Sequence, residues 1–257
     1  ERSGVNVWGL ADQGWGQRHD SAKGQRRSQQ DGRQQQLMRT DNPTDPLIGL
    51  PNPQAEVQFL TDAQREASMQ QALDGWQGDR DLWVYAYGSL IWNPEFEFAE
   101  KRHSILRGHH RSLCLWSRVN RGTPQLPGLV FGLDRGGSCR GVSFRVRAGD
   151  VPKAFEALWR REMATGAYHP RWLRCTTEQG HVQALAFVMD RLNPGYVPDL
   201  TEEHAVEIVC RASGRYGPCI DYAVQTHQAL EAAGIRDGRL ARLAQRLQDR
   251  LLEQGRT

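Results

Sequence analysis

The sequence has no apolar run of the roughly 20 residues that a membrane-spanning helix needs, so it predicts no transmembrane helix. Its first residues also lack the basic start, apolar stretch and small-residue cleavage site of a secretory signal. No Cys-x-x-Cys pair occurs, which argues against a disulfide framework or a zinc knuckle. The cysteines are Cys114, Cys139, Cys175, Cys210 and Cys219. We therefore expect a cytoplasmic protein with buried thiols, among which Cys139, in a glycine-rich turn, is the candidate reactive one.

Signatures of several common sites are missing as well. The eight histidines show neither H-x-x-x-H nor H-E-x-x-H spacing, so they predict no metal site. Ser89 does not lie in the G-x-S-x-G elbow of a hydrolytic serine. The glycine-rich segment RGGSCRG lacks the Lys-Ser/Thr of a phosphate-binding loop, which argues against nucleotide binding.

The chain also lacks a strong excess of positive charge. The formal net charge is +3, and residues 1–37 supply six Lys/Arg and four Asp/Glu, or +2 of it. The remainder is therefore +3 minus +2, about +1, which is too little for the basic surface of a nucleic-acid-binding protein. We interpret the eight tryptophans as core and pocket wall, not as a platform for stacked bases.

What is present divides into three parts. Residues 1–37 hold eight Gln and six Gly without helical or strand periodicity, so we expect a disordered tail or sequence upstream of a native start at Met38. Residues 38–80 are expected to be a proline-rich leader with one helix, over 61–76. Residues 81–257 are expected to form a single domain of the α+β class.

Periodicity and end signals place the elements of this domain. Strands are predicted at 83–85, 104–119, 172–177 and 181–189. The segment 128–146 predicts a hairpin with its turn at 135–138. Helices are predicted over 150–163, with Asp150 as N-cap and Pro152 in the first turn, and over 201–213, 218–233 and 238–254.

One carboxylate falls on the apolar side of the 150–163 helix. The apolar stripe of that helix consists of Val151, Phe155, Leu158 and Trp159. Glu162 continues the stripe, and a buried carboxylate must be hydrogen-bonded, paired or protonated. Burial raises its pKa, which suits a general base near neutral pH. The alternative is that Glu162 lies in a fraying last turn and reaches solvent or Arg161.

The stretch WVYAYGSL, at 83–90, ends an aromatic strand in Gly-Ser. Such an end either turns the chain or presents backbone N–H groups to a negatively charged ligand. Together with the R-G-x-P segment at 121–124, RGGSCRGVSFRV and WRREM, it resembles the ChaC family of γ-glutamylcyclotransferases from Leu82 to the C-terminal helices. The resemblance implies a small mixed β-barrel with flanking helices. It also implies conversion of glutathione to 5-oxoproline and Cys-Gly, with no metal or other cofactor.

Carried over to this chain, the resemblance implies that Glu162 is the catalytic base. It implies that the substrate loop consists of Val84, Tyr85, Ala86, Tyr87, Gly88, Ser89 and Leu90, with Ala86 where the family often has glycine. Tyr168 and Tyr222 are left as further candidates for substrate contact. The rival hypotheses are a cyclotransferase for another γ-glutamyl amine or dipeptide, and a non-catalytic regulator that binds γ-glutamyl groups.

Overall fold

The computed structural model describes residues 47, 50, 51, 53, 55–198, 200–253 and 255. The chain divides into two compact units, Glu1–Ile48 and Gly49–Thr257, and every element below belongs to the second unit. The tail predicted at 1–37 and the start predicted at Met38 lie outside the described residues. Of the predicted leader, residues 55–60 have no regular secondary structure, and helix α2 (Asp62–Leu73) follows them behind a capping box at Thr61.

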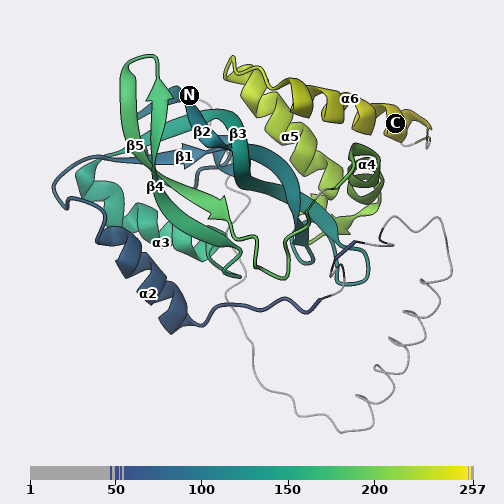
Figure 1. Cartoon of the computed structure of the whole chain (residues 1–257), viewed down its shortest axis with the longest axis horizontal. Coiled ribbons are helices and arrows are strands. Elements are labelled where there is room, and N and C mark those ends of the chain that lie inside the picture. The colour runs from purple at the N-terminus through teal and green to yellow at the C-terminus, as the bar shows by residue number, and fades with distance from the viewer. Residues whose placement is uncertain are drawn as a thin grey trace, which may run out of the picture. The chain divides into compact units, whose positions relative to one another are not determined.

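In the described part of the chain, five strands close into a barrel (Figure 1). They are β1 (Leu82–Ala86), β2 (Glu100–Ser117), β3 (Gly128–Val146), β4 (Tyr168–Thr177) and β5 (Gly180–Met189). Their order around the barrel is β1-β3-β2-β4-β5. β1 pairs antiparallel with β3 and parallel with β5, so the barrel is mixed, as predicted.

The predicted hairpin at 128–146 is wrong, because β3 runs through this segment as one strand. It pairs with β2 along its whole length, from Glu100↔Arg145 to Ser117↔Gly128. The glycines that suggested a turn form a bulge instead: Gly108 of β2 faces both Gly136 and Gly137 of β3. All three have positive φ, at 79°, 100° and 68°, a conformation that glycine adopts without steric cost.

The helices flank this barrel in two groups (Figure 1). α2 packs against α3 (Val151–Glu162). α4 (Glu202–Arg211), α5 (Cys219–Ala232) and α6 (Gly238–Glu253) pack on one another, and α4 and α5 also contact β3. The 3-10 turn η1 (Ser89–Ile91) follows β1, and the 3-10 turn η2 (Ala148–Asp150) precedes α3. The short strands β6 (Ser213–Gly214) and β7 (Gly217–Pro218) lie between α4 and α5.

Helix α3 buries the stripe that its sequence predicts. Val151, Phe155, Leu158 and Trp159 are all at most 2% exposed. The indole N–H of Trp159 also donates to the Ser68 hydroxyl of α2 at 3.2 Å, which fixes the two helices together. Asp150 immediately precedes the helix as predicted, but its side chain makes no capping hydrogen bond, because η2 leads directly into α3.

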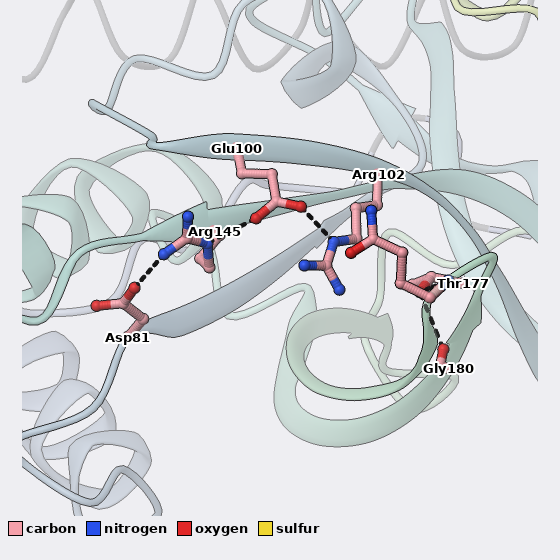
Figure 2. A network of polar contacts seen from close by, with 7 residues as sticks. Asp81, Glu100, Arg102, Arg145, Thr177 and Gly180 are labelled. Atoms are coloured by element: carbon pink, nitrogen blue, oxygen red, sulfur yellow. Dashed lines mark hydrogen bonds and ion pairs between the residues drawn. The ribbon is translucent and has the colours of Figure 1, made fainter.

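The outer face of the barrel carries a ladder of charged side chains (Figure 2). Arg145 of β3 donates to Glu100 of β2 at 2.8 Å and to Asp81, just before β1, at 2.5 Å. Glu100 in turn accepts from Arg102, whose guanidinium lies 4.5 Å from the centre of the Trp83 ring. Exposed pairs of this kind add little stability.

Within the residues that the structure describes, no helix is both long and apolar enough to cross a membrane.

Candidate active site

The predicted loop begins where the β1 ladder ends. The last pair between β1 and β3 is Ala86↔Val142, and η1 begins at Ser89. Tyr87 is buried and its hydroxyl donates to the Phe187 carbonyl of β5 at 2.9 Å. Gly88 is buried as well, and a Cβ there would lie 3.2 Å from the Tyr222 hydroxyl. Absence of a side chain at Gly88 therefore lets Tyr222 approach the backbone closely.

The backbone of this loop has unused donors. Among the described residues, none accepts a hydrogen bond from the N–H groups of Gly88, Ser89 or Leu90. Buried N–H groups in folded proteins nearly always have a partner. These donors are therefore available to an anionic or carbonyl ligand.

Glu162 is the last residue of α3, and its carboxylate lies mostly out of solvent, with 16% of its side chain exposed. Burial raises the pKa of Glu162, the charge of Arg161 opposes that rise, and the charge of Glu95 adds to it. The Arg161 Nε lies 3.1 Å from the Glu162 carboxylate. Both interpretations from the sequence thus hold in part: Glu162 is mostly buried with a raised pKa, and it also pairs with Arg161.

Arg161 connects this carboxylate to the loop after β1. Its Nη2 donates to the Ser89 hydroxyl at 2.6 Å. Its Nη1 donates to the Asn93 carbonyl and lies 3.2 Å from the Glu95 carboxylate. Glu95 has a φ of 58°, which is rare outside glycine, and its carboxylate also accepts from the Asn93 amide at 2.9 Å. One guanidinium therefore sets the distance between Glu162 and Ser89.

Three tyrosines lie close enough to the Glu162 carboxylate to feel its charge. Burial raises the pKa of Tyr87, Tyr168 and Tyr222, and the charge of Glu162 raises each of them further. The phenols are consequently neutral and can donate hydrogen bonds. Tyr222 accepts the Phe131 N–H at 3.1 Å, and Tyr168 donates to the Phe131 carbonyl at 3.4 Å. Both open candidates from the sequence thus lie within range of the Glu162 charge.

The remaining predicted loop residues lie deeper. Val84, Tyr85 and Ala86 belong to β1 and are fully buried. The Tyr85 hydroxyl donates to the Cys139 carbonyl at 2.9 Å, inside the barrel. Of this stretch, Tyr87 feels the charge of Glu162, and Ser89 is joined to Glu162 through Arg161.

Sequence reasoning did not identify Arg161 as the connection between the two halves of the site. The signal available for it was its position directly before Glu162. Tyr222, in α5, is one of the two tyrosines that the sequence left open, and the fold brings it to Gly88.

The candidate thiol Cys139 does not fit a reactive role. It is 2% exposed, and burial raises its pKa, which disfavours the nucleophilic thiolate. All five cysteines are buried and none is in a disulfide. Among the described residues, no group of three His, Cys, Asp or Glu side chains could hold a metal ion.

Fold and site together define the class of protein. It is an α+β barrel with a mostly buried carboxylate at a helix end, joined through Arg161 to a glycine loop whose N–H groups have no acceptor among the described residues. The chain belongs to the ChaC-like protein family, whose family model matches residues 82–250.

Named relatives share most of this stretch. The chain is 35% identical over 175 residues to the "Glutathione-specific gamma-glutamylcyclotransferase" of Escherichia coli (strain K12), covering 68% of this chain and 76% of the relative. It is 31% identical over 165 residues to "Glutathione-specific gamma-glutamylcyclotransferase 1" of Mus musculus, covering 61% and 74%.

A solved yeast structure of a cyclotransferase described as specific to glutathione has the same fold. It superimposes with a TM-score of 0.62 at 18% identity, over 66% of this chain and 96% of that one. At this identity the likeness concerns the fold alone.

Proposed function

We propose that this protein is a cytoplasmic γ-glutamylcyclotransferase that converts glutathione to 5-oxoproline and Cys-Gly, with Glu162 as general base and the loop at 87–90 as the γ-glutamyl site. The observation that carries the proposal is the placement of Glu162: a carboxylate of raised pKa, still reachable from solvent, joined through Arg161 to a loop with unused N–H donors. Relatives named for this activity support the choice of substrate.

The reaction closes a five-membered ring within the substrate. The α-amine of the γ-glutamyl group attacks the carbon of the γ-amide carbonyl, so a new C–N bond forms. The amide bond to cysteine then breaks, and Cys-Gly leaves. Because nucleophile and electrophile belong to one molecule, the site has mainly to hold it folded into a near-attack geometry.

The proton balance assigns a task to Glu162. At neutral pH the α-amine is an ammonium, which cannot attack. The Glu162 carboxylate takes one proton from the ammonium before the attack and a second from the same nitrogen once the new C–N bond has formed. It passes both to the leaving nitrogen, which departs as the ammonium of Cys-Gly, so no net proton is consumed. A carboxylate with raised pKa suits both steps better than an exposed one, because its affinity for a proton is nearer to the pH at which it works.

Negative charge develops on the carbonyl oxygen during the attack. The N–H groups of Gly88 and Ser89 are free to stabilise it, or to hold the α-carboxylate of the substrate. The Ser89 hydroxyl accepts from Arg161 and so keeps its own O–H for donation. The Tyr222 hydroxyl accepts the Phe131 N–H and so keeps its own O–H for donation, whereas the hydroxyls of Tyr87 and Tyr168 already donate to carbonyls.

Proton NMR of glutathione incubated with the protein tests this proposal. The wild type is compared with Glu162→Gln and, as a matched control, with Glu156→Gln on the exposed face of the same helix. We expect the wild type and Glu156→Gln to form 5-oxoproline and Cys-Gly, and Glu162→Gln to be slower by about 100-fold or more. Equal rates for wild type and Glu162→Gln would remove Glu162 from the mechanism.

The same experiment tests the choice of substrate. If the wild type leaves glutathione intact but cyclises other γ-glutamyl dipeptides or amines, the proposed reaction is supported and the choice of glutathione as substrate is wrong. Binding of γ-glutamyl compounds without turnover of any would favour the non-catalytic regulator.

A further inference from the structure

Arg111 of β2 lies where the ladder between β1 and β3 stops. The ladder ends at Ala86↔Val142. Beyond that point the guanidinium of Arg111 donates one hydrogen bond to the backbone of each chain segment. Nε donates to the Tyr87 carbonyl at 2.5 Å, and Nη2 donates to the Arg140 carbonyl at 2.7 Å. Its side chain is only 3% exposed. Arg111 thus replaces the missing strand pairing at the start of the loop.

A third contact of Arg111 reaches the C-terminal helix. Its Nη1 forms an ion pair with Asp237, the residue before α6. The Asp237 carboxylate also accepts the N–H groups of Arg239 and Leu240, at 3.2 and 3.1 Å. Asp237 therefore caps α6 and holds Arg111 at once. A planar guanidinium holds two carbonyls and a carboxylate with donors spread over one rigid fork, a geometry that the single ammonium of lysine does not provide.

The Tyr87 carbonyl decides where the next N–H points. The described peptide bonds are all trans, so carbonyl and N–H of the Tyr87–Gly88 peptide point in opposite directions. Because Arg111 holds the carbonyl, the Gly88 N–H is directed away from Arg111. That N–H is one of the three loop donors for which no described residue supplies an acceptor.

We propose that Arg111 is a positioning residue for catalysis: it fixes the Tyr87–Gly88 peptide so that the Gly88 N–H faces the substrate, and Asp237 keeps Arg111 in place. This inference rests on the proposed function for the nature of the anion, but the orientation of the peptide is a property of the protein alone. Arg111 acts through the backbone and makes no substrate contact. Helix α6 thereby supports the site indirectly, because the residue that caps it, Asp237, holds Arg111.

Arg111→Lys is the first test, because it keeps the positive charge for Asp237 and loses the fork that holds two carbonyls. We expect kcat on glutathione to fall about 10- to 100-fold, with KM changing by less than about three-fold, as for a misplaced donor to the transition state. The matched control is Arg102→Lys, an arginine of the same strand whose carboxylate partner lies on the outer face (Figure 2). It should retain wild-type kcat. Wild-type kcat in Arg111→Lys would overturn the proposal.

Amide hydrogen exchange of the peptide 84–92 gives a readout that needs no turnover. Faster exchange there in Arg111→Lys, with unchanged exchange in the other strands, supports the positioning role even if the wild type fails to cleave glutathione. Unchanged exchange overturns the role whatever the substrate. The two proposals can therefore fail separately.

Asp237→Asn keeps the inference testable if Arg111→Lys does not fold. Asparagine retains the helix cap but removes the charge that holds Arg111. We expect a fall in kcat of about two- to ten-fold and faster exchange at 84–92. Unaltered kcat and exchange in this variant would overturn the part assigned to Asp237.

Discussion

The Arg161 Nε lies 3.1 Å from the carboxylate of Glu162, its neighbour in sequence, while the same guanidinium bonds the Ser89 hydroxyl at 2.6 Å. The Arg161 guanidinium thus both restrains the proposed base and holds the proposed substrate loop. Burial and the nearby Glu95 raise the pKa of Glu162, and Arg161 limits that rise. The site thus balances desolvation against one fixed positive charge.

Arg161→Gln should shift the acid limb of the pH–rate profile upwards. Loss of the guanidinium leaves burial and the Glu95 charge to raise the pKa of Glu162 without opposition, and the surrounding phenols of Tyr87, Tyr168 and Tyr222 are neutral. Since ionised Glu162 is the proposed base, kcat/KM should begin to fall at a higher pH than in the wild type as the pH is lowered. Steady-state rates on glutathione across about pH 5 to 9 measure the shift.

The control for this shift is Arg160→Gln, the adjacent exposed residue of α3, which should leave the limb where it is. Should the limb of Arg161→Gln coincide with that of the wild type, a group other than Glu162 governs it.

Glu162→Gln should stabilise the fold near neutral pH while it removes activity. The folded protein holds Glu162 at a raised pKa, so the protonated form is favoured by folding and the ionised form opposes it. That favourable contribution is fully present below the pKa of the unfolded chain, about 4.3, and is lost as the pH rises through the folded value. Glutamine carries no charge at any pH, and its amide oxygen can still accept from Arg161.

Thermal unfolding at several pH values measures this effect. We expect a higher Tm than wild type at neutral pH and a difference that closes under acid conditions. Glu156→Gln, on the exposed face, should show no such trend. A lower Tm for Glu162→Gln at neutral pH would mean that the ionised carboxylate stabilises the fold.

The sequence predicts the parts of this molecule that follow from local periodicity. The stripe from Val151 to Trp159 defines α3, and Glu162 stands out because a charged residue continues an apolar stripe. The three C-terminal helices likewise lie where the sequence places them, within a residue or two at their ends. These features depend on neighbours within a few turns of chain.

What depends on distant partners was not predictable in the same way. Gly136 and Gly137 look like a turn in sequence, and only the partner strand β2 makes them a bulge within one long strand. Arg111 has no pattern that marks it, because the closed barrel makes its contact with Tyr87. Tyr222 was an open candidate in the sequence, but only the docking of α5 brings it to Gly88. The candidate base was therefore visible in the sequence, and most of its surroundings were not.

The two hydroxyls on Phe131 should differ in their effect on stability. Tyr222→Phe leaves the buried Phe131 N–H without its acceptor at 3.1 Å, which costs about 1–3 kcal/mol. Tyr168→Phe removes a longer contact, at 3.4 Å, to a carbonyl, and should cost less than about 1 kcal/mol. Urea unfolding of the two variants beside the wild type measures both. Equal losses would contradict the assigned bonds.

Gly141→Ala should damage the end of β1 that carries the loop. A Cβ at Gly141 would lie 2.3 Å from the Ala86 carbonyl oxygen and 2.9 Å from the Tyr85 hydroxyl, and the first of these is backbone that cannot turn aside. The strand must therefore shift, and overpacking of this kind costs about 1–3 kcal/mol or more.

The matched change is Gly149→Ala, in the exposed turn η2, where a Cβ meets nothing within 4 Å. It should leave the free energy of unfolding within about 0.5 kcal/mol of wild type. Because Ala86 directly precedes Tyr87, Gly141→Ala should also lower kcat/KM on glutathione, whereas Gly149→Ala should not. Urea unfolding and turnover of glutathione are measured on the same samples. If Gly141→Ala and Gly149→Ala have the same free energy of unfolding and the same kcat/KM, the close approach of β3 to the end of β1 does not constrain the loop.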